Sequence, residues 1–308
     1  MQSIPQSAFW VDVSFDASFS FINPNDPGWM MKYSFQVKEG IIEKEVFVVN
    51  EKRLIIRNKA ESRYKQEIVD PPKDKLIVQV RRDRTLYPEI ESLMSWVEGI
   101  FFVSCSIINP FTIINDHPGF INPIPFSELV ESLTKTENKK VLAAAKQLGY
   151  DIVEMESAEY FTNLKLVSVR ERYFRSGFLN VQLSSGMLRV LYLLSFMEYI
   201  KHSNRISLLL IDDLGEGLDY SRATHLGQLI FQQCLQDGLQ LIASSNDAFL
   251  MEIVDISNWQ ILRRTGGKVS SINQTTHPDL FRKFKMTGLS NFDFFSSDFI
   301  DKYLQSVQ

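Results

Sequence analysis

The chain has 308 residues, of which 44% are hydrophobic and 23% are charged, so it can bury a sizeable core as one large domain or two smaller ones. The formal net charge of -4 gives no global electrostatic case for nucleic-acid binding, although local basic patches are not excluded. The two cysteines, Cys105 and Cys234, lie in a strand-like and a helical run. This favours a reduced, cytoplasmic setting over a disulfide framework.

Neither a signal sequence nor a membrane span is predicted. Residues 1–5 are not followed by a basic segment and an apolar core. The most apolar window, residues 93–108, is short and is interrupted by Glu98. We therefore expect no membrane partner.

The N-terminal part predicts an antiparallel sheet. Apolar and polar side chains alternate between residues 8 and 60, as in residues 33–37 and 44–49. Turn sequences rich in Asn, Pro and Gly separate these runs, for example at residues 23–28. We therefore expect residues 1–87 to form an antiparallel β lobe.

The next part predicts mostly helices. Residues 88–99 have a helical pattern, residues 100–108 predict a buried strand or helix, and residues 125–149 predict one or two helices. The charge run at residues 135–140 is typical of a solvated helix face. Sustained heptads are absent, which excludes a long coiled-coil arm. We expect residues 88–165 to form a helical insertion.

Two stretches in the second half of the chain place polar groups at the ends of apolar elements. LSSGMLR, residues 183–189, puts small residues before an apolar helical run, and such a helix N-terminus is open to an anion. LLLIDD, residues 208–213, is typical of a buried parallel strand that ends in two carboxylates, Asp212 and Asp213.

A third stretch repeats the pattern. LIASSND, residues 241–247, predicts a second buried strand that ends in polar groups, among them Asn246. Parallel strands that deliver polar side chains to one edge are typical of nucleotide sites, because ligands of open α/β sheets bind beyond the carboxyl ends of the strands. Taken singly, each stretch is explained as well by an ordinary turn or helix cap.

The end of the chain predicts a hairpin and an aromatic tail. Residues 259–264 and 268–272 flank Gly266 and Gly267, a good hairpin signal. The tail at residues 281–295 has aromatic side chains beside lysines, which can stack nucleic-acid bases. Packing is the better explanation, because phenylalanine is mostly a buried residue.

In order and spacing, the three polar stretches resemble motifs of the ABC-type ATPase heads of the OLD, RecF and SMC-like group, an OLD-like branch of the AAA-family ATPases. LSSGMLR resembles the signature motif, LLLIDD the Walker B strand, Gly217-Leu218-Asp219 the D-loop and SSND the switch segment. The resemblance implies a P-loop-NTPase-like α/β fold, an ABC ATPase parallel sheet with helices. In it, residues 166–308 form the core lobe.

The resemblance also implies ATP and Mg²⁺ as cofactors and gives roles to four residues. Asp212 would hold Mg²⁺, usually through a water. Asp213 stands where these families most often have a glutamate that orients or deprotonates the attacking water, and aspartate is one methylene shorter. Asn246 stands where they often have histidine, and it can donate to a γ-phosphate oxygen. Asp247 would brace it.

A further set would contact nucleotide across a dimer. In the resembling families two heads dimerise head to tail, so that the signature of one head closes on nucleotide held by the other. The corresponding residues here are Ser184, Ser185, Gly186, Arg189 and Asp219. The implied partners are a second head in a homodimer or heteromer, an effector protein and DNA, in DNA repair or anti-phage defence.

No GxxxxGK[ST] loop occurs in the sequence, so the Walker A cradle for the α- and β-phosphates is absent from this chain. Three explanations stay open: a truncated product, a split ATPase with the loop on another chain, or a degenerate relative. We expect ATP hydrolysis only if a missing N-terminus or a partner supplies the loop. The alternative is a catalytically silent module that binds a partner ATPase or an effector.

Overall fold

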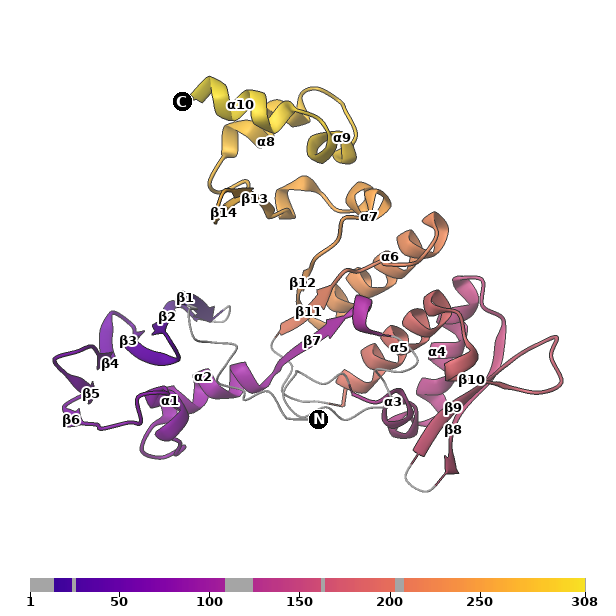
Figure 1. Ribbon diagram of the computed structural model, residues 1–308, viewed down its shortest axis with the longest axis horizontal. Helices are drawn as coiled ribbons and strands as arrows, with labels where there is room; N and C mark the ends of the chain where they lie inside the picture. Colours follow the sequence, from indigo (N-terminus) through magenta and orange to yellow (C-terminus); the bar gives the residue numbers. More distant parts are fainter. Residues whose placement is uncertain (1–13, 24–25, 109–123, 162–163, 203–207, 308) are drawn as a thin grey trace. The chain divides into compact units, whose positions relative to one another are not determined.

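The computed structural model shows an α/β chain that divides into two compact units, Met1–Glu98 and Gly99–Gln308 (Figure 1). The first unit carries an antiparallel sheet and the second carries a parallel sheet with helices, as the sequence predicts. The structure describes the whole chain except residues 1–13, 24–25, 109–123, 162–163, 203–207 and 308.

Within the described residues, the sheet of the first unit has six strands in the order of the sequence, and each strand pairs antiparallel with the next. This confirms the predicted antiparallel lobe. The strands are β1 (Ser14–Asn23), β2 (Asp26–Lys38), β3 (Ile41–Val49), β4 (Lys52–Arg57), β5 (Ser62–Tyr64) and β6 (Glu67–Ile68).

Two helices, α1 (Ile77–Val80) and α2 (Pro88–Glu98), complete the first unit. Ile90 and Leu93 of α2 are buried in the same core as Phe47 of the sheet. The helix predicted at residues 88–99 is therefore confirmed, and it belongs with the β unit.

Glu45 is a fully buried carboxylate in this first unit. It accepts hydrogen bonds from the Tyr33 hydroxyl at 3.0 Å and from the backbone amides of Ile77 and Val78 at 2.7 and 3.3 Å. The carboxylate thereby satisfies amides at the start of α1, which have no partner within the helix. Burial raises the pKa of Glu45, and the three hydrogen bonds act against that rise.

The second unit is built on a three-stranded parallel sheet with β11 in the centre (Figure 1). Its strands are β7 (Ile100–Ser104), β11 (Leu208–Asp212) and β12 (Gln240–Ala243). The register sets Ser104 opposite Asp212, and Ala243 opposite Ile211. The carboxyl ends of all three strands therefore meet at one edge, as predicted for the second and third stretches.

Helix α5 (Ser185–Ile200) lies at the centre of the core of this unit. It is apolar on nearly all sides, and a helix of that kind is stable only when it is surrounded by protein. The other elements before the hairpin are η2 (Cys105–Ile107), α3 (Phe126–Ser132), α4 (Lys135–Gln147), β8 (Ile152–Phe161), β9 (Leu164–Glu171), β10 (Phe178–Leu179), η3 (Asn180–Gln182), α6 (Tyr220–Asp237) and α7 (Ala248–Ile253).

The range in which we expected a helical insertion, residues 88–165, contains helices and strands. Helices α3 and α4 lie where one or two helices were predicted. In the ambiguous run at residues 100–108, residues 100–104 form β7, a strand of the parallel sheet, and residues 105–107 form the short 3-10 helix η2. Strand β8 pairs antiparallel with β9. Periodicity cannot separate a short buried strand from a buried helix, so the sequence pattern fits both for this run.

Strand β12 differs from the buried strand that its apolar sequence predicts. It lies at an edge of the sheet among the described residues, and Ile242 is 56% exposed. Leu239 and Leu241 pack against the core, so only one face of this strand is covered. The prediction of a buried strand is therefore wrong, because Gln240, Ile242 and Ala243 are exposed and Leu241 is only partly buried. The predicted parallel pairing is confirmed.

The C-terminal part has a small core of its own. The predicted hairpin is confirmed as β13 and β14, and Phe294 of the tail is buried, with its ring centroid 4.4 Å from that of Phe284 and 5.0 Å from that of Phe281. No helix in the described ranges is both long and apolar enough to cross a membrane. The elements here are η4 (Ile256–Asn258), β13 (Ile261–Thr265), β14 (Lys268–Ile272), α8 (Pro278–Lys285), α9 (Asn291–Ser296) and α10 (Phe299–Val307).

Candidate functional site

Asp212 ends the central strand of the parallel sheet and is held from both sides by serines of the neighbouring strands. Ser104, the last residue of β7, donates a hydrogen bond from Oγ to Asp212 Oδ2 at 3.2 Å. Ser244, directly after β12, donates from Oγ to Asp212 Oδ1 at 2.5 Å. Each carboxylate oxygen therefore has one hydroxyl donor, and the orientation of the carboxylate is set by all three strands.

Asp213 follows in a left-handed backbone conformation, with φ of 56°. Its amide donates to Ser244 Oγ at 3.0 Å, and the amide of Leu214 donates to the Ser244 carbonyl at 2.9 Å. Aspartate tolerates this conformation better than most residues, and strained backbone positions gather at functional sites. Ser244 therefore holds the carboxylate of Asp212 and the backbone after it, where Asp213 follows directly.

The predicted signature stretch begins α5. Ser184 is the N-cap, and its Oγ accepts a hydrogen bond from the Met187 amide at 3.3 Å. Ser184 and Ser185 are both exposed. The stretch is therefore an ordinary N-cap in its local geometry, and it is also the accessible N-terminus of a 16-residue helix.

Gly186, on the first turn of α5, packs against the loop that follows Asp213. A Cβ atom at Gly186 would lie 3.1 Å from the Gly217 carbonyl oxygen and 3.2 Å from a methyl carbon of Leu218. Such contacts are closer than ordinary van der Waals distances. Glycine at this position therefore permits the signature helix and the predicted D-loop to touch.

Arg189, one turn further along α5, also contacts this loop. Its Nη1 donates to the Glu216 carbonyl at 2.8 Å. Gly217 has φ of +74°, and a Cβ atom there would overlap Arg189 Nη1. The guanidinium, for which we expected a nucleotide contact, is bound to the backbone of the loop.

Asp219 caps α6. Its Oδ1 accepts a hydrogen bond from the Arg222 amide at 3.1 Å, and its Oδ2 pairs with Arg222 Nη1. The hydrogen bond from the Arg222 amide is the main cause that lowers the pKa of Asp219. Arg222 also covers the ring of Tyr150 at 4.6 Å from its centroid and donates from Nε to the Leu148 carbonyl at 3.0 Å.

Asn246 is exposed in the loop after β12. The neighbouring Ser245 anchors this loop by donating to the Leu214 carbonyl at 2.8 Å. Asp247, which we expected to brace Asn246, caps α7 by accepting hydrogen bonds from the amides of Phe249 and Leu250 at 2.8 and 3.0 Å.

The contacts of Gly186 and Arg189 with the loop after Asp213 bring together the two carboxylates, the first turns of α5 and the D-loop. The buried thiol of Cys105 lies near this region. Burial raises the pKa of this thiol to about 12, and the charges of Arg189, Asp213 and Asp212 also act on it.

Two residues of this arrangement carried no predicted role. Ser244 lies in the third stretch, where it was only one of several polar groups after a strand. Ser104 ends an apolar run whose type the sequence leaves open. A serine directly after a run of β-formers is the signal that finds Ser104, once that run is known to pair with the strand of Asp212.

The donor set at the strand edge suits Mg²⁺. Magnesium prefers oxygen ligands and keeps several waters, and the side chains at this edge, Asp212, Asp213, Ser104 and Ser244, all offer oxygens. Within the described ranges, no three His, Cys, Asp or Glu side chains are grouped to hold a metal ion. The described residues therefore fit a Mg²⁺ ion that would take one or two carboxylates from this chain and its other ligands from waters and phosphate oxygens.

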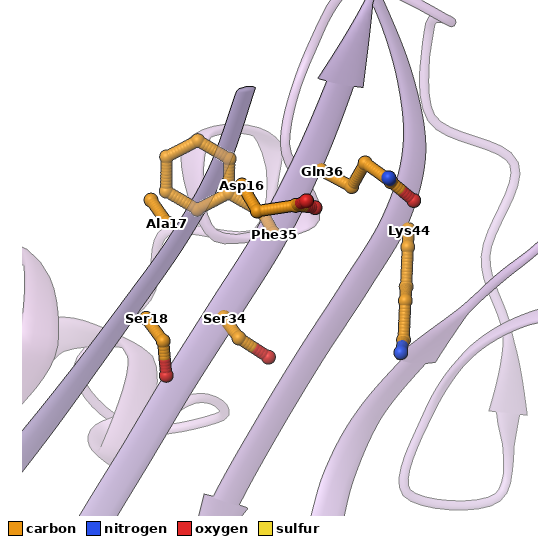
Figure 2. A pocket seen from close by; sticks show the side chains of 7 residues that line it. All are labelled: Asp16, Ala17, Ser18, Ser34, Phe35, Gln36 and Lys44. Carbon is orange, nitrogen blue, oxygen red and sulfur yellow. The ribbon is translucent and has the colours of Figure 1, made fainter. Parts of the chain in front are cut away.

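A shallow pocket in the first unit is unrelated to these residues. Figure 2 shows its side chains projecting from three adjacent strands, β1, β2 and β3. None of the predicted site residues lines it. The lining residues are Asp16, Ala17, Ser18, Ser34, Phe35, Gln36 and Lys44.

Comparison with known proteins finds similarity only among solved structures: no protein-family model and no curated protein matches the chain. One similar structure is an SMC head bound to the C-terminal winged-helix domain of ScpA, with 12% identity, a TM-score of 0.49 and coverage of 86% of this chain and 76% of that chain. The SMC head domain from Thermotoga maritima has 12% identity, a TM-score of 0.46 and coverage of 84% and 74%.

A third similar structure is an SMC head with an extended coiled coil, bound to the C-terminal domain of ScpA derived from Pyrococcus furiosus. It has 10% identity, a TM-score of 0.45 and coverage of 88% of this chain and 80% of that chain. At these identities and TM-scores, similarity alone does not assign a function. The function proposed below therefore rests on the residues and contacts of this chain.

Proposed function

We propose that this chain forms the half of an ABC-type ATPase head that closes on the γ-phosphate side of MgATP, while another polypeptide segment supplies the phosphate loop. The observation that carries the proposal is the geometry of Asp212. Both of its oxygens are held by serines of the flanking parallel strands. This carboxylate lies at the carboxyl edge of the sheet, where open α/β sheets bind their ligands.

The residues at this edge divide the chemistry between them. Asp212 would hold Mg²⁺, in an orientation set by Ser104 and Ser244. Mg²⁺ held there would supply positive charge that neutralises the negative charge of the phosphates. Asp213 would orient the attacking water, and the exposed Asn246 would donate to a γ-phosphate oxygen.

The accessible start of α5 supports a role in an assembly. Its N-terminal amides and helix dipole favour an anion, and the side chains of Ser184 and Ser185 are exposed. We propose that they face nucleotide held by a second head, in a homodimer or a heteromer. From the resemblance we also propose a DNA-related or anti-phage task with DNA or an effector protein as partner.

The edge strand β12 is where we propose that the missing part of the sheet joins. In the part of the chain that the structure describes, β12 pairs only with β11, and its Ile242 side chain is more than half exposed. Strands of parallel sheets are normally buried on both faces. A further parallel strand beside β12 would pair with its backbone edge, and the crossover helix that such a strand needs would cover a face of the sheet. The loop after that strand would bring a phosphate loop to the edge that carries Asp212.

A catalytically silent interaction module is the second candidate. One observation favours it: the sequence has no GxxxxGK[ST] loop. Such a module would keep the shape of the head and use it to bind a partner ATPase or an effector.

Titration calorimetry with MgATP distinguishes the two candidates. We expect weak or no binding by this chain alone, and at least tenfold tighter binding when it is mixed with a polypeptide that carries GxxxxGK[ST] and is encoded beside it. Asp212→Asn in the mixture should abolish the gain, whereas the exposed control Asp237→Asn should keep it. Tight binding by the chain alone would contradict the missing-loop proposal, and no gain in the mixture would favour the silent module.

A further inference from the structure

The loop that joins β11 to α6, residues 213–219, begins at the second carboxylate, Asp213. It is attached to α5 by contacts that the chemistry above does not use. The loop turns tightly, because the amide of Glu216 donates to the Asp213 carbonyl at 3.0 Å and the amide of Leu218 donates to the Gly215 carbonyl at 3.1 Å. Its two ends are the strand residue Asp212 and the helix cap Asp219. Any movement of this loop therefore acts directly on the carboxylate edge.

Arg189 is the one described side chain of α5 that donates a hydrogen bond to this loop. Its Nη1 donates to the Glu216 carbonyl at 2.8 Å, and its Nε is buried without a hydrogen-bond partner among the described residues. A cationic donor makes a stronger hydrogen bond to a carbonyl than a neutral one. The guanidinium therefore binds the loop through Nη1, and its Nε is buried away from solvent.

Two glycines allow this contact to be close. Gly217 has no Cβ to displace the guanidinium, and Gly186 has none to separate the first turn of α5 from the Gly217 carbonyl. Side chains at either position would push the loop away from the helix. The first turns of α5 and the loop therefore form one rigid contact, made of two backbone surfaces and one guanidinium.

We propose that Arg189 is a positioning residue that couples the N-terminus of α5 to the carboxylates Asp212 and Asp213, and that it does not contact nucleotide. This inference rests on the proposed function, since α5 would meet nucleotide at Ser184 and Ser185. A nucleotide that draws the first turn of α5 toward its phosphate would move the loop with it. The closing of the interface and the placement of the water-orienting carboxylate would then be one event.

Hydrogen exchange on the isolated chain tests the contact without nucleotide. In Arg189→Met, which keeps an unbranched stem and removes the donors, peptides that span residues 213–219 should exchange about tenfold faster, because a charge-assisted hydrogen bond that closes the loop is lost. Arg189→Lys should restore part of the protection. The control Arg170→Ala, which removes an exposed ion pair between Arg170 on β9 and Glu154 on β8, should leave these peptides unchanged.

Steady-state hydrolysis in the mixture with the GxxxxGK[ST] polypeptide tests the coupling. Arg189→Met should lower kcat about tenfold and leave the KM for ATP within about twofold, and Arg189→Lys should recover part of kcat. Unchanged exchange in Arg189→Met, or a raised KM with unchanged kcat, would overturn the inference. If the unsubstituted mixture does not hydrolyse ATP, the proposed function fails, and the exchange experiment alone still decides whether Arg189 holds the loop.

Discussion

The backbone at Asp213 gives a physical reason for an aspartate where the resembling ATPases most often have a glutamate. With φ of 56° this residue is left-handed, and aspartate adopts that region more readily than most residues with a side chain. The aspartate side chain is one methylene shorter than that of glutamate, but the left-handed backbone changes the direction in which the side chain leaves the Cα atom. The sequence shows the residue type at this position and cannot show its backbone angle, because the glycines of this turn, Gly215 and Gly217, come after it.

Substitutions at Asp213 should separate its chemical role from its conformational one. We expect the free energy of unfolding of Asp213→Asn to stay within about 0.5 kcal/mol of that of the parent chain. That of Asp213→Ala should fall by about 1 kcal/mol, because alanine is strained at positive φ. Both should lower ATP hydrolysis in the loop-supplied mixture at least about hundredfold. Denaturant unfolding and a phosphate-release assay give the two quantities. Near-normal hydrolysis by Asp213→Asn would remove the water-orienting role.

Glu45 should make the stability of the chain depend on pH. Its pKa in the folded state is raised by burial above the ordinary value of 4.5, so the stability that it contributes is present in full below that value and is lost as pH rises through the raised pKa. The free energy of unfolding of the parent chain, minus that of Glu45→Gln, should therefore fall as pH rises above about 4.5. Urea unfolding at several pH values measures this difference.

The control for this comparison is Glu61→Gln, at an exposed position of the same unit. A difference between the parent chain and Glu45→Gln that stays constant with pH would show that burial does not perturb Glu45. A constant offset by itself is expected, because glutamine cannot reproduce all three hydrogen bonds of the carboxylate.

At the scale of elements, local pattern predicted most of the secondary structure and failed where tertiary neighbours decide. The apolar run of β11 and its two carboxylates were sufficient to place a parallel strand and its edge. The run of β12 is as apolar, yet Ile242 is exposed because the strand lies at the edge among the described residues. The role of Ser104 also could not be predicted, since it depends on β7 pairing with β11.

Phe294 should stabilise the small C-terminal core. Its buried ring lies against those of Phe281 and Phe284, so Phe294→Ala should cost about 3–5 kcal/mol in the stability of this part. The neighbouring Phe292 is partly exposed, and Phe292→Ala should cost much less. Limited proteolysis of the full chain, followed at cleavage sites within residues 256–307, measures the difference. Equal resistance of the two variants would contradict the packing explanation for the aromatic tail.

At the scale of the whole molecule, the predicted β lobe and the first compact unit end at different residues. The lobe was expected to end at residue 87, whereas the unit extends to Glu98 because α2 buries Ile90 and Leu93 against the β core. The periodicity of α2 shows that it has an apolar face. It does not show which sheet that face covers, so the domain boundary depends on contacts that the sequence does not display.

The candidate site is likewise only partly readable from the sequence. The carboxylates, the small residues before α5 and the D-loop are visible as motifs, and the structure brings them together in the second unit. The attachment of Arg189 to the Glu216 carbonyl is invisible in the sequence, where an arginine after a signature-like stretch indicates a phosphate contact equally well. This hydrogen bond is the reason that we propose a positioning role for Arg189.

The central claim is that the edge at Asp212 and Asp213 is half of an ATP site, completed by a phosphate loop on another segment. ATP hydrolysis tests it most directly, measured for this chain, for a GxxxxGK[ST] polypeptide encoded beside it, and for their equimolar mixture. The account predicts Mg²⁺-dependent hydrolysis by the mixture at least tenfold above the sum of the separate chains. No gain on mixing, or hydrolysis by this chain alone at the rate of the mixture, would contradict it.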